Sequence, residues 1–287
     1  MKSSTSYAYA KLNLSLDIVS RLDSGYHNMK MVMQTISLSD KITIECKPGS
    51  GFSINPGLPY LPRDERNIAV KAAKLFFEHT GISGFHTFIN IEKSISVCAG
   101  MGGGSADAAC VLRTLDDLFE TELGHDTLRS LGLSIGSDVP FCISGGTALA
   151  EGRGEILTYL PPLPVAFFVV CKPHFSCSTP ELFSLVKCDK IRARPDTAGL
   201  IAALENSDLG GVARRMYNVF EDILPRGKSA IDDIKWNLLD YGALGAVMTG
   251  SGPTVFGIFD NENSAHRAYE RLKADYDECF LAHSPQP

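Results

Sequence analysis

The chain has 287 residues, 44% of them hydrophobic, and its 33 acidic and 27 basic side chains give a formal net charge of −6. This charge argues against a broad surface for nucleic acid or for an anionic membrane. No apolar run approaches the ~20 residues that a membrane-spanning helix needs. The eight cysteines include no Cys-x-x-Cys pair, so their spacing indicates neither a zinc site nor a disulfide framework. We therefore expect a cytoplasmic protein that is long enough for two domains.

The first predicted strand covers residues 7–19, in which apolar and polar side chains alternate. Its polar face carries Lys11 and Asn13. A lysine at such a position is most often a solvated strand residue, so a functional role for Lys11 needs support from elsewhere in the chain. A second strand is expected at residues 42–46, followed by a surface loop over the Gly- and Pro-rich residues 47–64.

The most informative stretch is a glycine-rich loop at residues 100–104, with four glycines in five positions. A strand is predicted before it over 85–93, and a helix with Ser105 as N-cap and Asp107 in its first turn is predicted after it. Bare backbone amides at the positive end of a helix dipole favour an anion such as phosphate. A tight turn for close packing is the alternative. The loop fits neither a dinucleotide fingerprint nor a P-loop, because it lacks the third glycine of the one and the lysine of the other.

The other elements are predicted from spacing and from turn residues. Asn67 is expected to cap a helix, and Asp138 lies in a polar turn, where an acidic residue is ordinarily a turn former. Three prolines between residues 160 and 164 mark a boundary, so we expect domains at 1–160 and 161–287. The further expected elements are helix 127–133, strand 165–171, helices 181–186, 196–205, 208–224 and 228–241, a strand–turn–strand unit at 243–259 and helix 262–276. The pattern is α+β in both halves.

Three separated stretches resemble the motifs of one family, the GHMP kinases. Ala8–Leu14 is similar to the first motif of the family, Gly100–Ala109 to its phosphate loop, and Met248–Thr254 to its third motif. The resemblance extends from about residue 7 to residue 259. It implies an α+β, two-domain GHMP kinase fold, with an N-terminal α/β domain that contains a left-handed crossover and a C-terminal ferredoxin-like domain.

Two further stretches resemble one branch of that family, which phosphorylates the 2-hydroxyl of a cytidyl diphosphate sugar alcohol in the non-mevalonate isoprenoid pathway. They are Gly25–His27 and Gly136–Phe141. The chain departs from the family pattern at Ser24, Ser96 and Met101, where Asp, Pro and Leu are usual. A homoserine- or mevalonate-type kinase stays open as an alternative, and so does a catalytically silent nucleotide-binding protein on the same fold.

The resemblance implies a role for individual residues. Lys11 and Asp138 match the catalytic pair of the family, and Ser105 matches a serine near the β-phosphate and Mg²⁺. Tyr26 and Phe183 match aromatic walls for the cytosine ring, whose edge His27 would read; ordinary packing is the alternative for both walls. The ATP site is implied to comprise Asn67, Ala99, Gly100, Met101, Gly102, Gly103, Gly104 and Ser105, and the acceptor site Asn13, Tyr26, His27, Thr179 and Phe183.

The implied partners are small molecules. They are ATP, Mg²⁺ and the cytidyl diphosphate sugar alcohol, with no nucleic acid and no membrane. The chain itself is expected to be a monomer or a weak homodimer.

Overall fold

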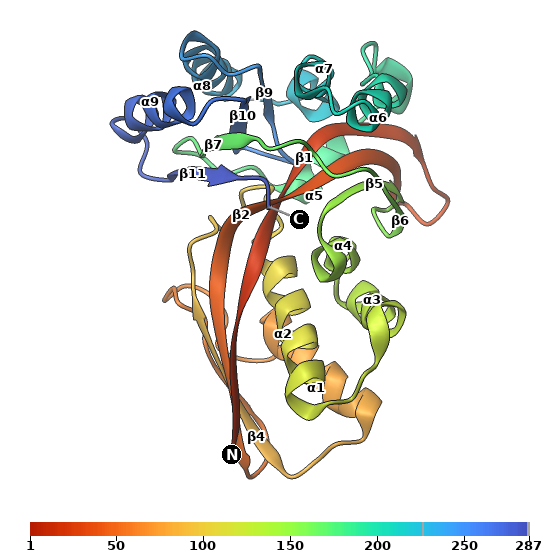
Figure 1. The fold of residues 1–287 in the computed structure, drawn as a ribbon. Helices are drawn as coiled ribbons and strands as arrows, with labels where there is room; N and C mark the ends of the chain where they lie inside the picture. Colours follow the sequence, from red (N-terminus) through yellow and green to blue (C-terminus); the bar gives the residue numbers. More distant parts are fainter. Residues whose placement is uncertain (226, 286–287) are drawn as a thin grey trace. The chain divides into compact units, whose positions relative to one another are not determined.

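The computed structural model describes residues 1–225 and 227–285, which form two compact units. The first unit contains residues 1–10, 39–97 and 102–145. The second contains residues 11–38 and 98–101 together with the described residues from 146 onwards. The two longest strands, β1 (Lys2–Arg21) and β2 (His27–Pro48), each contribute one part to either unit (Figure 1). The domain boundary expected after residue 160 stays a prediction.

In the first unit, helices pack on a part of a sheet whose strand order is β3 (Phe52–Asn55), β4 (Phe85–Glu92), β2 and β1. Strand β4 pairs antiparallel with β2, Lys41 opposite Glu92, and parallel with β3. Helix α1 (Ile68–Thr80) connects the parallel pair and contacts both of its strands, which makes it a crossover connection. The remaining helices of this unit are α2 (Gly103–Phe119), α3 (Gly124–Ile135) and α4 (Val139–Ser144), and α2 packs against α1 and α4.

Helix α1 begins where the sequence predicts. The side chain of Asn67 accepts a hydrogen bond from the backbone N–H of Ala69 at 3.0 Å, and Gly81 ends the helix in the left-handed conformation. The buried side of α1 comprises Ala69, Val70, Ala72, Ala73 and Phe76. The N-cap prediction for Asn67 is therefore confirmed.

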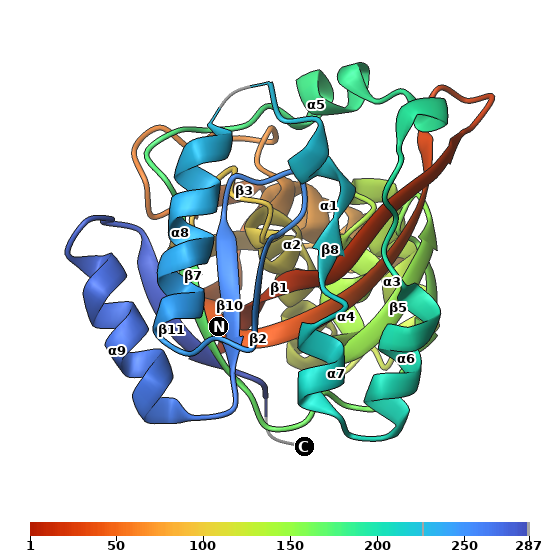
Figure 2. The ribbon, with the colours of Figure 1, turned by 90° about the horizontal axis from the view of Figure 1, so that it is seen from above.

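The second unit contains a four-stranded antiparallel sheet. Its strand order is β11 (Cys279–His283), β7 (Phe167–Cys171), β10 (Val255–Phe259) and β9 (Gly245–Met248). Helix α8 (Lys228–Asp240) contacts β9 and β10, and α9 (Glu262–Lys273) contacts β7 and β11; Figure 2 shows the two helices side by side. This β-α-β-β-α-β arrangement confirms the expected ferredoxin-like domain.

Shorter elements complete the second unit. Strand β5 (Thr147–Gly152) pairs with β2 and with β6 (Ile156–Tyr159), and β8 (Tyr217–Asn218) pairs parallel with β1. The short helices are α5 (Thr179–Leu185), α6 (Thr197–Glu205) and α7 (Leu209–Ala213). The 3₁₀ turn η1 (Cys188–Lys190) lies between α5 and α6, and the 3₁₀ turn η2 (Val219–Asp222) follows β8.

Several sequence predictions are wrong in detail. The surface loop expected over 47–64 contains β3, which the glycines and prolines around it obscure. The helix expected over 208–224 is divided into α7, β8 and η2. It breaks because Asn218 donates hydrogen bonds to the carbonyl oxygens of Met248 and Gly250, both at 2.8 Å. These long-range bonds outweigh the helical spacing of the apolar residues.

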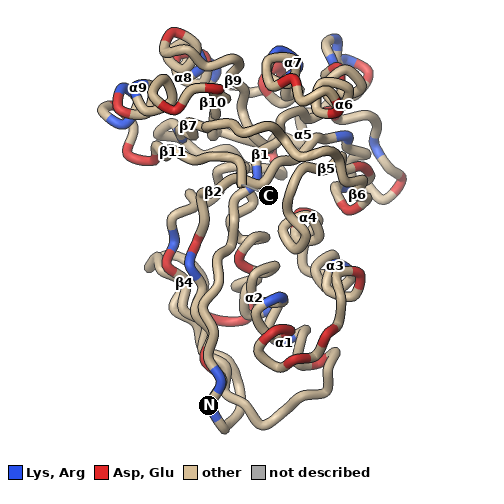
Figure 3. The backbone as a smooth tube through the Cα atoms, in the orientation of Figure 1, with Lys and Arg blue, Asp and Glu red and all other residues tan. Residues whose placement is uncertain are grey.

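Figure 3 shows acidic and basic residues interspersed along the described chain in both units. None of the helices formed by the described residues has the length and apolar character needed to cross a membrane.

Candidate active site

Three stretches that are distant in sequence meet around Asn13 in the second unit. The ammonium of Lys11 donates to Oδ1 of Asn13 at 2.7 Å, and the backbone N–H of Asn13 donates to Oγ1 of Thr249 at 3.0 Å. The Thr249 hydroxyl also lies 3.4 Å from Oδ1 of Asn13 and from the carbonyl oxygen of Gly100. The first motif, the glycine-rich loop and the third motif are thus joined by one hydrogen-bonded chain.

The polar face of β1 is buried. Lys11 is 5% exposed, and both Asn13 and Thr249 are fully buried. The interpretation of Lys11 as a solvated strand residue is therefore wrong. Removing an ammonium from water is costly unless polar partners surround it, and Lys11 has such a partner in the Asn13 amide.

The first part of the glycine-rich loop packs on the turn after β9. Gly100 has φ +76°, and a Cβ added to it would lie 2.2 Å from the carbonyl oxygen of Thr249. A Cβ on Gly250, whose φ is +58°, would lie 2.7 Å from the carbonyl oxygen of Gly100. The backbone N–H of Lys11 donates to the carbonyl oxygen of Met101 at 3.1 Å. Close packing, the alternative explanation for the glycines, thus accounts for Gly100.

The second part of the loop forms the start of α2 in the first unit. Gly102 is the N-cap residue, with φ 68°, and no side chain of the described residues caps the helix. Ser105 is therefore not the N-cap, and Asp107 lies in the second turn, because the helix begins at Gly103. The first N–H groups of a helix have no acceptor within it, and they carry the positive end of the helix dipole. This helix start is suited to bind phosphate.

Asp138 and Asn67 also belong to the first unit. Asp138 is half-buried at the N-terminus of α4, with φ −85° and ψ −14°, and its carbonyl oxygen accepts from the N–H of Cys142 at 3.1 Å. Its side chain does not cap α4. The Asn67 amide, besides capping α1, donates to the carbonyl oxygen of Pro62 at 3.1 Å. The catalytic and adenine-binding roles of these two residues stay predictions.

The residues expected to hold the acceptor base lie in the second unit. The rings of His27 and Phe183 are stacked, with centroids 5.1 Å apart and planes at 28°. Phe183 also meets Phe220 edge to face at 5.0 Å. Tyr26 is 57% exposed, and the guanidinium of Arg153 lies 5.1 Å from the centre of its ring. The structure thus brings His27 to Phe183, and it places Tyr26 against Arg153.

Two further observations concern the acceptor residues. Burial, with a smaller contribution from Arg21, lowers the pKa of His27 below its usual value, which favours the neutral imidazole at pH 7. Thr179, the first residue of α5, lies with its Oγ1 2.6 Å from Oγ of Ser251 in the third motif. Thr179 is an exposed residue.

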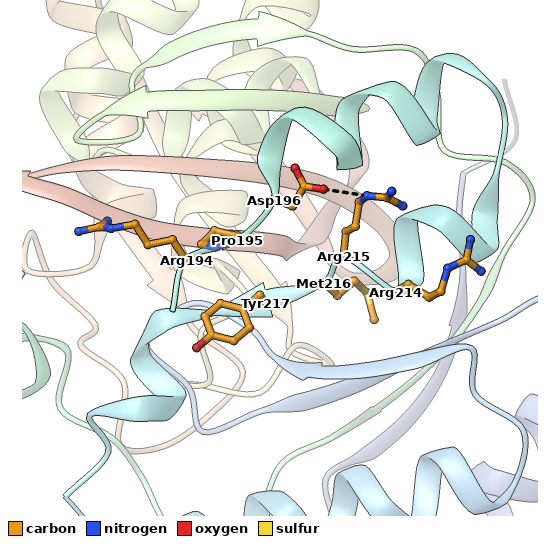
Figure 4. Close-up of a pocket in the computed structure, with 7 residues that line it drawn as sticks. All are labelled: Arg194, Pro195, Asp196, Arg214, Arg215, Met216 and Tyr217. Carbon is orange, nitrogen blue, oxygen red and sulfur yellow. Dashed lines mark hydrogen bonds and ion pairs between the residues drawn. The ribbon is translucent and has the colours of Figure 1, made fainter. Parts of the chain in front are cut away.

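A pocket of about 430 Å³ elsewhere in the second unit contains none of the expected site residues. Figure 4 shows its lining: Arg194, Pro195, Asp196, Arg214, Arg215, Met216 and Tyr217. Each arginine has a carboxylate partner: Asp17 at 2.6 Å from Arg194, Asp208 at 3.6 Å from Arg214, and Asp196 at 3.0 Å from Arg215. These pairs compensate the positive charges, so the pocket is not a strong site for a phosphate.

The buried contacts of three residues, Thr249, Asp40 and Lys93, were not predicted from the sequence. Thr249 was part of the third motif, but the spacing of that motif did not assign its hydroxyl a partner. Asp40 and Lys93 form a buried ion pair at 2.5 Å in the first unit. Both lie at the ends of polar–apolar alternation, which gives no sign that they are buried.

Models of known protein families match residues in both halves of the chain. The GHMP kinases N terminal domain matches residues 67–146, and the GHMP kinases C terminal domain matches residues 200–278. A 4-diphosphocytidyl-2-C-methyl-D-erythritol kinase of Clostridium botulinum (strain Langeland) is 44% identical over 277 residues, 96% of this chain and 98% of that protein. The kinase of the same name from Clostridium perfringens (strain ATCC 13124) is 46% identical over 269 residues, 94% of this chain and 93% of that protein.

A solved structure agrees with these relatives. The crystal structure of a 4-(cytidine 5'-diphospho)-2C-methyl-D-erythritol kinase matches with a TM-score of 0.83 and 30% sequence identity. The match covers 99% of this chain and all of that one.

Proposed function

The chain belongs to the GHMP kinases, in the family of the 4-diphosphocytidyl-2-C-methyl-D-erythritol kinases, and we propose that it phosphorylates the 2-hydroxyl of 4-diphosphocytidyl-2-C-methyl-D-erythritol with ATP. The stacked rings of His27 and Phe183, together with the exposed ring of Tyr26 beside Arg153, support this choice of acceptor. A homoserine or mevalonate kinase has no cytosine to hold. A neutral His27 supports this choice, because it offers one hydrogen-bond donor and one acceptor to a base edge.

ATP binding is assigned to the start of α2. The N–H groups of Gly103, Gly104 and Ser105 lack acceptors within the helix, and no described side chain caps that end. These are the features of a polyphosphate site. Asn67 is assigned to the adenine, with its side chain already held by Ala69 and Pro62.

The proposed transfer needs in-line placement, charge neutralisation and a place for the acceptor proton. The 2-hydroxyl oxygen bonds to the γ-phosphorus while the bond from that phosphorus to the oxygen bridging it to the β-phosphorus breaks. The carboxylate of Asp138 takes the hydroxyl proton. The ammonium of Lys11, which Asn13 holds in place, stabilises charge on the transferring group.

Mg²⁺ fits this scheme as an ion held largely by the nucleotide. Among the described residues there is no group of three or more His, Cys, Asp or Glu that could hold a metal ion. Mg²⁺ is commonly bound through few protein groups together with substrate phosphates and water, and the half-exposed Ser105 hydroxyl is suited to be one of them. When bound, the ion would neutralise phosphate charge.

The proposal also includes the location and the oligomeric state of the enzyme. We place it in the cytoplasm, where ATP is made. Its state as a monomer or weak homodimer stays a prediction.

The proposal is tested by ³¹P NMR of the purified protein with ATP and Mg²⁺. With the cytidyl substrate we expect ADP and a new phosphomonoester signal, and with homoserine or mevalonate no new ester. A homoserine or mevalonate ester, formed while the cytidyl substrate stays unchanged, would replace the proposal with one of the alternative kinases. Binding of ATP without turnover of any acceptor would favour the silent nucleotide-binding protein.

A further inference from the structure

A buried cluster of charges lies beneath the start of α2 in the first unit. It consists of Lys93, which follows β4, together with Asp40 of β2 and Asp107 of α2. The Lys93 ammonium lies 2.5 Å from Oδ2 of Asp40 and 2.9 Å from Oδ2 of Asp107. The three side chains are 5%, 0% and 7% exposed in that order. Three buried ionisable groups in contact are unusual, since each of them is costly to remove from water.

Asp40 also holds the backbone that leads towards the glycine-rich loop. Its second oxygen, Oδ1, accepts from the N–H of Ser94 at 2.6 Å and from the N–H of Ile95 at 2.8 Å. One carboxylate therefore fixes both the ammonium of Lys93 and the two residues after it. Charge-assisted bonds of this kind are stronger than neutral ones.

Lys93 lies close to the first residue of the phosphate-binding helix. A Cβ added to Gly103 would be 3.4 Å from the Lys93 ammonium and 3.0 Å from Cγ2 of Ile95. The backbone of Gly103 thus lies against the cluster, so that a side chain at this position would have to displace Ile95 by a few tenths of an ångström. Lys93 joins β2, the segment after β4 and the second turn of α2 at this point.

Asp107 is only partly satisfied in this cluster. Its Oδ1 is buried and, among the described residues, has no hydrogen-bond partner. Burial raises the pKa of Asp107 to about 8; Lys93 opposes this rise, and Asp40 adds to it. A protonated Asp107 leaves the cluster with one ammonium and one carboxylate. A second buried negative charge near the helix start would oppose the binding of phosphate.

We propose that Lys93 is a positioning residue for ATP, which, through Asp40 and Asp107, holds Gly103 and the first turn of α2 in the geometry that binds the phosphates. The proposal rests on the proposed function only in its assignment of ATP to this helix. Lys93 is 5% exposed, so it acts on the nucleotide through the backbone of α2.

The test compares Lys93→Met with the matched control Lys41→Met. Lys41 pairs with Glu92 at 2.9 Å in the same sheet, but both side chains are about half exposed, 43% and 58%. We expect Lys93→Met to raise the Kd for ATP by at least ~10-fold, because small displacements of binding groups have large effects. The KM for the cytidyl acceptor should change less than twofold, and Lys41→Met should leave both constants unchanged. Lys93→Arg, which keeps a charged donor, should recover most of the affinity.

Direct calorimetric titration with ATP separates this proposal from the proposed function, because it needs no acceptor. Lys93-dependent ATP binding in an enzyme that does not phosphorylate the cytidyl substrate would support the positioning role alone. A folded Lys93→Met protein with the wild-type Kd for ATP, or with equal losses for ATP and acceptor, would overturn it.

Lys93→Met leaves the carboxylate of Asp40 buried without an ion-pair partner, which can prevent folding. A second variant, Asp107→Ala, tests the proposal in that case. Asp107→Ala removes one partner of Lys93 and keeps the Lys93–Asp40 pair. We expect a Kd for ATP raised by about threefold or more, with the acceptor KM unchanged. An unchanged Kd for ATP in folded Asp107→Ala would contradict the role of the cluster.

Discussion

The two parts of the glycine-rich loop differ in what a side chain would meet. At Gly100 a Cβ would lie 2.2 Å from the backbone oxygen of Thr249, which cannot move without moving the third motif. At Gly103 and Gly104 it would meet the ends of the Ile95 and Ile68 side chains, at 3.0 and 3.1 Å. Gly100 is thus part of the protein's own packing, whereas Gly103 and Gly104 begin a helix whose amides remain for a ligand. A run of glycines can thus serve both the packing of the protein and the binding of a ligand.

The largest effect is expected at Asp138, outside both parts of the loop. Asp138→Ala should lower kcat by ~10²–10⁴-fold, because the acceptor proton loses its base. ATP binding should be nearly unchanged, since the amides of α2 do not depend on Asp138. The measurement pairs steady-state kinetics with calorimetric titration of ATP. Undiminished turnover would refute the catalytic role of Asp138.

Gly100→Ala tests the packed part of the loop. The new Cβ would clash with the Thr249 oxygen, and the positive φ of Gly100 is strained for alanine. We expect a loss of about 3 kcal/mol in the free energy of unfolding, measured by urea denaturation. Gly146→Ala is the control, because Gly146 also has a positive φ, +80°, but open space around it. Equal losses in the two variants would mean that backbone strain, and not the contact with Thr249, governs Gly100.

Ser105→Ala tests the ligand-binding part. It removes a hydroxyl from the first turn of α2 without adding atoms, so stability should stay close to that of the wild type. If this hydroxyl meets the nucleotide phosphates, kcat/KM for ATP should fall ~10-fold or more, as expected for the loss of a bond to a charged group. Wild-type kinetics with ATP in this variant would remove Ser105 from the site.

Tyr26→Ala should affect the acceptor alone. Stacking of an aromatic side chain on a base contributes ~1–3 kcal/mol, so the KM for the cytidyl substrate should rise ~10-fold while that for ATP stays constant. Steady-state kinetics in both substrates measure this difference. If both KM values rose together, stacking of cytosine on Tyr26 would be the wrong explanation.

The most gradual expected effect is a pH dependence of the free energy of unfolding. The pKa of Asp107 is about 8 in the folded protein, against 3.8 for an ordinary aspartate. The folded state therefore holds the extra proton, and stability should fall as pH rises from about 4 to about 8. The slope is at most about 1.4 kcal/mol per pH unit.

Asp107→Asn should remove this fall. The charged and thiol groups next to Asp107 are Lys93, Asp40 and Cys110, and all three remain in the variant. The difference in Tm between the variant and the wild type should thus grow with pH between 6 and 8. Parallel curves would show that Asp107 does not titrate in this range.

Local patterns predicted much of the fold. The alternation in β1 and the cap at Asn67 follow from spacing and turn residues, whereas the ferredoxin-like domain was implied by the resemblance to the GHMP kinases, and its last strand, β11, was not predicted. The break in the helix expected over 208–224 does not follow from spacing. It is caused by two hydrogen bonds from Asn218 to backbone oxygens of Met248 and Gly250, which lie 30 and 32 positions away in the sequence.

In the candidate site, too, local patterns did not predict the long-range contacts. The motifs identified Lys11, Asn13 and the glycine-rich loop, but not that Thr249 joins them. Nor does spacing indicate that Lys93 is buried between two carboxylates, since a lysine after a strand is ordinarily exposed. Such contacts depend on the tertiary fold and have no local signature.

The binding of ATP phosphates by the start of α2 can be observed directly by ¹H–¹⁵N NMR of protein labelled with ¹⁵N-glycine and titrated with ATP and Mg²⁺. We predict that the amide signals of Gly103 and Gly104 shift strongly and saturably, while that of Gly81 stays in place, because Gly81 follows the end of α1 and Gly104 contacts Ile68 at its start. Unmoved Gly103 and Gly104 signals at saturating ATP would contradict the account.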